Sequence, residues 1–182
     1  MNPTDLISVI AAITGAVAAI FSGVSVGVTQ AQTRSNIQMT CMTTFAGIQS
    51  KRLNIHDTID AQNYYRELMD LEWSEYYARS IGSIDKVAFE KWVESWHDLY
   101  NKDAIVVHDT VNRNPPLTII NHTVSYRTEW DKWRSYGYFH NKDSFVGFME
   151  NIFKKDDSEI IPYVKHYHFW WHRNHITRIP GS

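Results

Sequence analysis

The chain opens with a long apolar stretch and then changes to a pattern that is typical of amphipathic helices. From Leu6 to Thr33 every residue is uncharged, and Ile, Val, Ala and Gly dominate. A helix of about 20 apolar residues crosses about 30 Å of hydrocarbon. The pattern therefore predicts one transmembrane helix, with its span over residues 6–28. A cleaved signal peptide and a buried core helix are the alternatives, and the lack of a basic leading segment disfavours the first of them.

Basic residues follow this stretch and predict its orientation. Arg34, Lys51 and Arg52 all lie after the predicted span, and basic residues favour the cytoplasmic side of a membrane. We therefore expect a single-pass protein of the cell (inner) membrane, with its N-terminus outside and its C-terminal domain in the cytoplasm.

The remaining pattern predicts an all-α fold in three parts. Residues 1–30 form the anchor, residues 31–54 a polar stalk that continues the helix, and residues 55–182 a mostly helical soluble domain. At 182 residues the chain has room for one such domain.

Within the soluble domain, apolar residues recur at helical spacing. Gly82 is a plausible helix stop and Asp85 a plausible cap for the next helix. The clearest amphipathic pattern follows, and its aromatic stripe is expected to be core: Phe89, Trp92, Val93, Trp96, Leu99 and Tyr100.

The pattern weakens after this helix. Residues 104–124 contain Val- and Ile-rich pieces split by Asn114-Pro115-Pro116, which predicts a loop or short extended link. Residues 125–136, 143–155 and 158–175 again have helical spacing.

Composition limits the classes of function. The net charge is −2 at pH 7, so a surface built for nucleic acid is not expected. Aromatic residues make up 14% of the chain, which favours a folded domain over a disordered tail. Cys41 is the only cysteine, so an intrachain disulfide is impossible and a reducing compartment is favoured.

Small residues recur at every fourth position of the predicted span. Gly23-Val24-Ser25-Val26-Gly27 has the small-xxx-small spacing that lets two helices approach closely. The stripe predicts self-association, or docking to a helix of another membrane protein, through Ala11, Gly15, Ala19, Gly23 and Gly27. The alternative is that the small residues face lipid.

The histidine-rich tail is a candidate metal site. On a helix His168, His172 and His175 share a face, and imidazoles at this spacing bind zinc or another transition metal. The glutamate of a metalloprotease helix is missing from the motif. A belt of basic and aromatic residues at a membrane surface, a stacking surface for single-stranded nucleic acid, and an ordinary packed helix with exposed histidines remain open.

Two weaker patterns also involve histidine. Glu94 and His97 have the Glu-x-x-His spacing of di-iron bundles, but a second pair is missing. Three His-Asp dipeptides occur, beginning at His56, His97 and His108, and their spacing selects no metal set. Glu67, Asp70, Glu72 and Glu75 read as the solvated face of a helix.

The layout resembles that of uncharacterised bacterial membrane-anchored helical proteins. The likeness rests on an N-terminal apolar helix, a polar stalk and an aromatic body around Leu71-Glu72-Trp73-Ser74-Glu75-Tyr76, Gly82-Ser83-Ile84-Asp85 and Phe89-Glu90-Lys91-Trp92. It implies a helical domain behind an anchor and no particular activity.

No complete catalytic motif occurs in the sequence, which favours a non-catalytic protein without a cofactor. We predict a membrane-anchored scaffold or interaction protein that associates through its N-terminal helix and docks partners with its helical domain. The bilayer and a second copy or another membrane protein are the expected partners, and nucleic acid is not. The competing hypothesis is a membrane-tethered enzyme that uses zinc or another transition metal bound by the tail histidines.

Overall fold

A computed structural model of the protein describes residues 3–111, 118–167 and 169, without the side chains of residues 3–21, 23, 24, 110, 111 and 118. The elements in chain order are α1 (Pro3–Lys51), the 3-10 turn η1 (Arg52–Asn54), α2 (Thr58–Ser80), α3 (Lys86–Lys102), β1 (Ala104–Val111), β2 (Thr118–Ser125), α4 (Tyr126–Ser135), α5 (Asp143–Phe153) and α6 (Asp157–His166).

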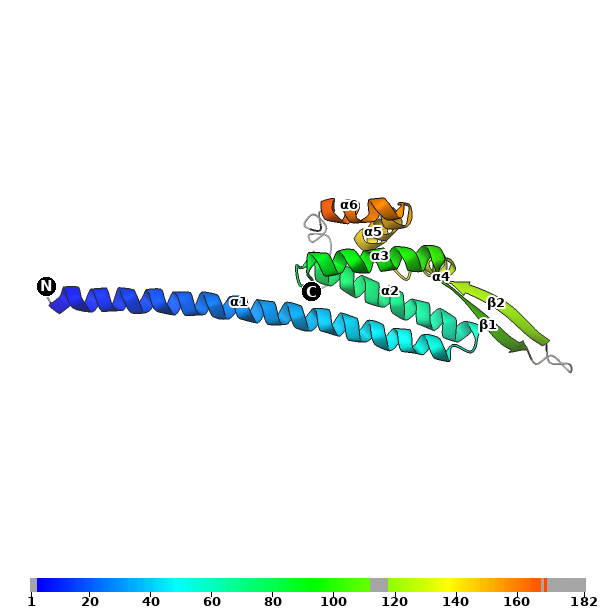
Figure 1. The fold of residues 1–182 in the computed structure, drawn as a ribbon, viewed down its shortest axis with the longest axis horizontal. Coiled ribbons are helices and arrows are strands. Elements are labelled where there is room, and N and C mark those ends of the chain that lie inside the picture. The colour runs from blue at the N-terminus through cyan, green and yellow to red at the C-terminus, as the bar shows by residue number, and fades with distance from the viewer. Residues whose placement is uncertain (1–2, 112–117, 168, 170–182) are drawn as a thin grey trace.

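One long helix carries a packed helical body at its C-terminal end (Figure 1). Ile37, Cys41 and Ile48 of α1 belong to the core or pack against it. We call residues 37–111 and 118–167 the head, and residues 3–36 of α1 the arm. The arm extends past the head as a single helix, and its described side chains, Ser22 and residues 25–36, are all exposed.

Local capping defines where the head's helices begin. Asp57 accepts a hydrogen bond from the Asp60 amide at 2.8 Å, and Asp85 accepts one from the Val87 amide at 2.8 Å. Such side-chain acceptors satisfy amides that have no intrahelical partner. The predicted cap at Asp85 is therefore confirmed. Gly82 has a φ of +75° in the turn between α2 and α3, which confirms the predicted stop.

Aromatic rings fill the core between α2, α3, α4 and α5. Phe89, Val93 and Trp96 of α3 are buried, as the stripe predicted. The Tyr100 and Phe153 rings stack at 3.7 Å between centroids, and Trp130 meets Phe153 edge-on at 5.2 Å. Rings in these arrangements add stabilisation beyond their buried area, so α3, α4 and α5 form one packed unit.

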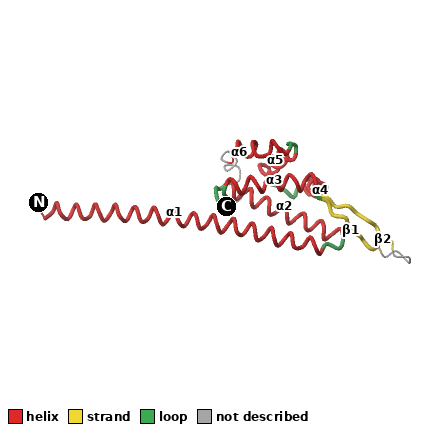
Figure 2. The backbone as a smooth tube through the Cα atoms, viewed as in Figure 1, coloured by secondary structure: helices red, strands yellow, loops and turns green. Residues whose placement is uncertain are grey.

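A two-stranded antiparallel hairpin forms the end of the head opposite the arm (Figure 2). The register pairs Ala104 with Ser125 and His108 with Asn121. Val107 and Val124 of the hairpin are buried. The all-α prediction is wrong here: the chain is mostly helical, but residues 104–111 and 118–125 are paired strands rather than a loop or short link.

Nor does the structure support the predicted membrane anchor. In the part of the chain that is described, no helix combines the length and the apolar character required to cross a bilayer. The single-pass span at residues 6–28 is therefore corrected, together with the inner-membrane location and the orientation derived from it. α1 continues past Val28 to Lys51, and its described side chains from Ser25 onward include the polar or charged Gln30, Gln32 and Arg34.

Candidate functional site

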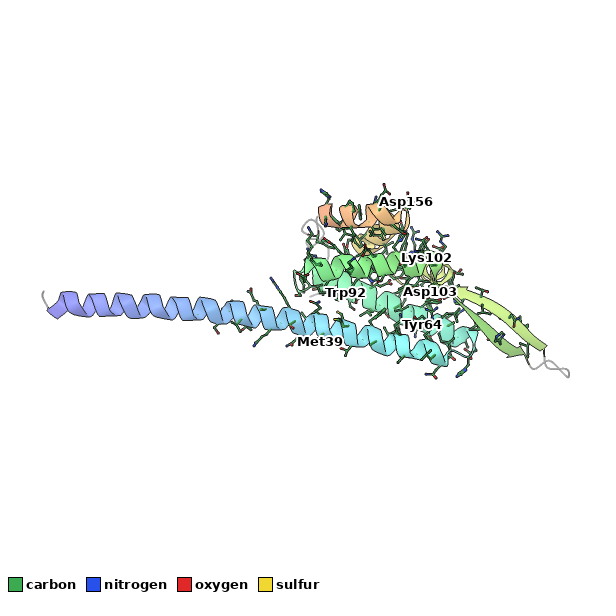
Figure 3. The ribbon with its side chains drawn as sticks, in the orientation of Figure 1. Met39, Tyr64, Trp92, Lys102, Asp103 and Asp156 are labelled. Atoms are coloured by element: carbon green, nitrogen blue, oxygen red, sulfur yellow. The ribbon has the colours of Figure 1, made fainter. Side chains whose placement is uncertain are left out.

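A narrow groove runs between α1 and α3, with α2 as its floor. Its volume is about 170 Å³. Phe45 and Met42 of α1 form one wall, where both are substantially exposed, and Trp92, labelled in Figure 3, lies on the α3 wall. The full lining is Met42, Phe45, Leu68, Leu71, Glu72, Glu75, Trp92, Ser95, Trp96 and Leu99.

Two carboxyl groups lie in the floor of this apolar groove. Glu72 is buried, and one of its oxygens accepts a hydrogen bond from the Tyr126 hydroxyl. Its Oε1 atom is buried without a hydrogen-bond partner among the described residues. Burial disfavours the charged form and raises the pKa of Glu72 well above its ordinary value.

Glu75, one helical turn further along α2, has a similar environment. Its Oε2 atom accepts a hydrogen bond from Trp96 Nε1 at 3.2 Å. Burial raises the pKa of Glu75 to about 8, against an ordinary value of 4.5. Glu75 is therefore mostly protonated at neutral pH, and burial disfavours the charge of Glu72 as well. Both side chains are buried, so the prediction that they belong to a solvated helix face is wrong.

Cys41 belongs to a second hollow, which lies between α1 and α2. This hollow has a volume of about 580 Å³ and also includes Lys51 and Glu67. Burial, and next the charge of Glu75, raise the pKa of Cys41 to about 11. The thiol is protonated at neutral pH, so it is a poor nucleophile and a poor metal ligand in this fold.

A polar cluster forms where α3 meets α6. His97 is buried, and its Nε2 atom lies 2.9 Å from the Lys155 carbonyl oxygen. Its Nδ1 atom lies 3.3 Å from Asp157 Oδ1. The neighbouring Asp98 contacts Lys102 Nζ at 2.5 Å, and the same ammonium is 4.0 Å from Asp157 Oδ2.

The residues of the weaker histidine patterns lie apart and have separate structural roles. Asp57 caps α2, and Asp109 accepts hydrogen bonds from Thr58, at 2.6 Å from the hydroxyl. His108 Nδ1 contacts Asn121 across the hairpin at 2.7 Å. Glu94 pairs with Lys91 at 2.8 Å, so the di-iron spacing brings no carboxylate to His97 from that position in the described structure.

Most residues of the two predicted sites lie beyond what the structure describes. His168, His172 and His175 are outside the described residues. Ala11, Gly15, Ala19 and Gly23 lie on α1, but only its backbone is described there. At Gly27 an added Cβ would meet no described atom within 4 Å, so this position of the stripe is open.

Sequence reasoning missed the residues that the fold brings together. Asp157 joins His97 from 60 positions further along the chain, and no local motif links them. Comparison of the chain with protein-family models, with curated protein sequences and with solved structures gave no significant match.

Proposed function

We propose that the protein is a self-associating helical scaffold, in which the arm pairs with the arm of a second copy. The observation that carries this proposal is the geometry of α1. It is one helix from Pro3 to Lys51, and among its described side chains those that pack in or against the core are Ile37, Cys41 and Ile48, in its C-terminal part.

Exposure of the arm to water is energetically unfavourable. It is uncharged from Leu6 to Thr33, and its described side chains are exposed. Removing apolar surface from water is the main favourable term in protein association. A second helix along the arm supplies that burial.

An exposed apolar face continues along α1 beyond the arm. Val28, Met39 and Met42 are all more than half exposed. At 100° per residue their positions fall within about 60° of one another. Val28 and Met39 lie on the side away from Cys41 and Ile48, and Met42, at the edge of this face, also lines the groove. Gly27 borders this face, so a partner helix could approach the backbone closely there.

The sequence of the arm supports a paired helix. Apolar residues follow one another there at alternating spacings of four and three: Leu6, Ile10, Ile13, Val17, Ile20 and Val24. This is the spacing of a coiled-coil seam, in which each apolar residue inserts between residues of the facing helix.

Two valines provide a matched test. Val28 lies on the exposed face, and Val26 lies about 200° around the helix from it. Their exposed fractions are similar, 52% and 57%. We expect the full-length chain to form dimers or larger oligomers in sedimentation velocity, and Val28→Lys to weaken association at least about tenfold, because a charge would be placed on the face that the partner helix covers.

Val26→Lys is the control and should leave the oligomer intact. A monomeric wild-type chain over the micromolar range would contradict self-association. Equal loss in both variants would show that general charge, rather than this face, controls the oligomer.

A further inference from the structure

His97 has its proton positions constrained by the backbone. A carbonyl oxygen only accepts, so the 2.9 Å contact with the Lys155 oxygen requires a proton on Nε2. The Asn101 amide, which can turn its oxygen toward the ring, contacts the same nitrogen at 2.9 Å. A metal-binding histidine typically donates its other ring N–H to a carbonyl or carboxylate in this way.

The other ring nitrogen is the unusual one. Nδ1 is buried and has no hydrogen-bond partner among the described residues. It faces Asp157 Oδ1 at 3.3 Å. A nitrogen lone pair and a carboxylate oxygen repel each other at this distance unless a positive charge, either a proton or a cation, lies between them.

A third potential ligand lies at the same place. One donor atom from each of His97, Asp98 and Asp157 lies within 4.8 Å of the other two. We propose that these three side chains bind a divalent transition-metal ion of the Zn²⁺ class, which links α3 to α6. A mixed nitrogen and oxygen ligand set suits such ions.

Only exposed groups must move to complete the site. Tetrahedral zinc, with bonds of about 2.0–2.1 Å, holds its ligand atoms about 3.3 Å apart. The Nδ1 to Asp157 distance already meets this value. The Asp98 and Asp157 side chains are 57% and 74% exposed, so their carboxylates can rotate inward.

Lys102 is the competing cation. Its ammonium pairs with Asp98 at 2.5 Å and lies 4.0 Å from Asp157. Figure 3 shows Lys102 at the end of α3, on the same side of the head as Asp156 at the start of α6. The Lys102 side chain is 63% exposed, so it can swing into solvent when a metal ion binds.

The test is titration of the metal-free full-length chain with Zn²⁺ by calorimetry, and with Co²⁺ by its visible d–d absorption. We expect one ion per chain. Asp98→Asn with Asp157→Asn removes two exposed ligands without disturbing the core, and should weaken binding at least about 100-fold.

Lys102→Met should instead tighten binding about five- to tenfold, because it removes a positive charge within about 4 Å of both carboxylates. Lys91→Met, an exposed lysine on the same helix, should leave the affinity unchanged. A metal ion bound elsewhere on the chain, or a cluster with only a structural role, should not show this gain.

Two results would overturn the proposal. One is the absence of stoichiometric uptake of either metal by the wild-type chain. The other is binding that survives the double aspartate variant but disappears when His166, His168, His172 and His175 are replaced together, which would assign the metal to the tail.

Discussion

Two carboxyl groups buried on one side of α2 make the stability of the head depend on pH. In the unfolded chain Glu75 titrates near 4.5, whereas burial raises its pKa to about 8 in the folded chain. Between these values the unfolded chain has lost a proton that the folded chain retains. The free energy of unfolding therefore falls as pH rises through this window, and the effect levels off above about pH 8.

Glu75→Gln should remove the contribution of Glu75 to this dependence, while Glu72 keeps its own. Glutamine can still accept the hydrogen bond from Trp96 Nε1, which Glu75 accepts at 3.2 Å. We expect the variant to be more stable than the wild type at pH 8 by about 4 kcal/mol, with little difference at pH 4.5. Urea denaturation between pH 4.5 and 8.5 measures this.

Glu94→Gln on α3 is the matched control, because Glu94 pairs at the surface with Lys91. It should retain the wild-type slope. An unchanged slope in Glu75→Gln would show that Glu75 ionises normally in the folded head.

Single residues were predictable where their role is local. Asp85 and Gly82 act through the backbone within a few residues, so their types and order predicted a cap and a stop. Glu72 and Glu75 were not predictable in the same way. Their burial depends on Trp96 and Tyr126, which arrive from α3 and α4, and the local pattern of charges on α2 contains no trace of these partners.

Among the elements, the helices were predicted well and the hairpin was not. Residues 104–111 and 118–125 are rich in β-branched side chains on both sides of Asn114-Pro115-Pro116. That arrangement is itself a hairpin signal. The prolines, however, predict only that a helix cannot continue. The pairing of the two strands depends on their contacts with the rest of the head, because an isolated two-stranded hairpin is only marginally stable.

An ion pair fastens the end of α1 to the end of α3. Arg52 donates to both oxygens of Asp103, at 2.8 and 2.5 Å. Asp103 directly follows α3, and its carbonyl accepts from the Tyr126 amide at the start of α4. Asp103, labelled in Figure 3, therefore connects the end of α1, the end of α3 and the start of α4.

Arg52→Lys should lower the free energy of unfolding by about 1–2 kcal/mol, because lysine cannot reproduce two parallel hydrogen bonds to one carboxylate. The neighbouring Lys51 is a matched control. It contacts Glu67 at 2.7 Å in a more exposed setting, so Lys51→Gln should change stability by less than about 0.5 kcal/mol. If both variants lost the same free energy of unfolding in urea denaturation, the Arg52–Asp103 pair would be no more stabilising than the Lys51–Glu67 pair.

For the arm, the sequence predicted the helix but not its surroundings. The apolar pattern of residues 6–28 correctly indicated a long helix, but hydrophobicity alone did not identify what surrounds it. A transmembrane helix and a helix that pairs with a second helix both contain runs of apolar residues. They differ in length, in polar continuation and in partners, and α1 continues through Gln30, Gln32 and Arg34 to Lys51.

Gly27 allows self-association to be separated from the stability of the helix. Leucine has a higher helix propensity than glycine by roughly 0.8 kcal/mol, and an added Cβ at Gly27 meets no described atom within 4 Å. Gly27→Leu should therefore preserve or strengthen α1 itself. If small residues let two arms approach closely, the added bulk should nevertheless weaken the oligomer about tenfold or more, and Gly23→Leu should add to the effect.

Thr33→Leu supplies the control for this experiment. Thr33 is exposed and lies five residues after Val28, about 140° around the helix from it and therefore outside the proposed contact face. The variant adds similar apolar bulk and should leave the oligomer unchanged. Helix content from circular dichroism and mass from light scattering, measured on the same samples, separate the two effects. An oligomer of unchanged mass in Gly27→Leu would mean that the arms do not meet at this glycine.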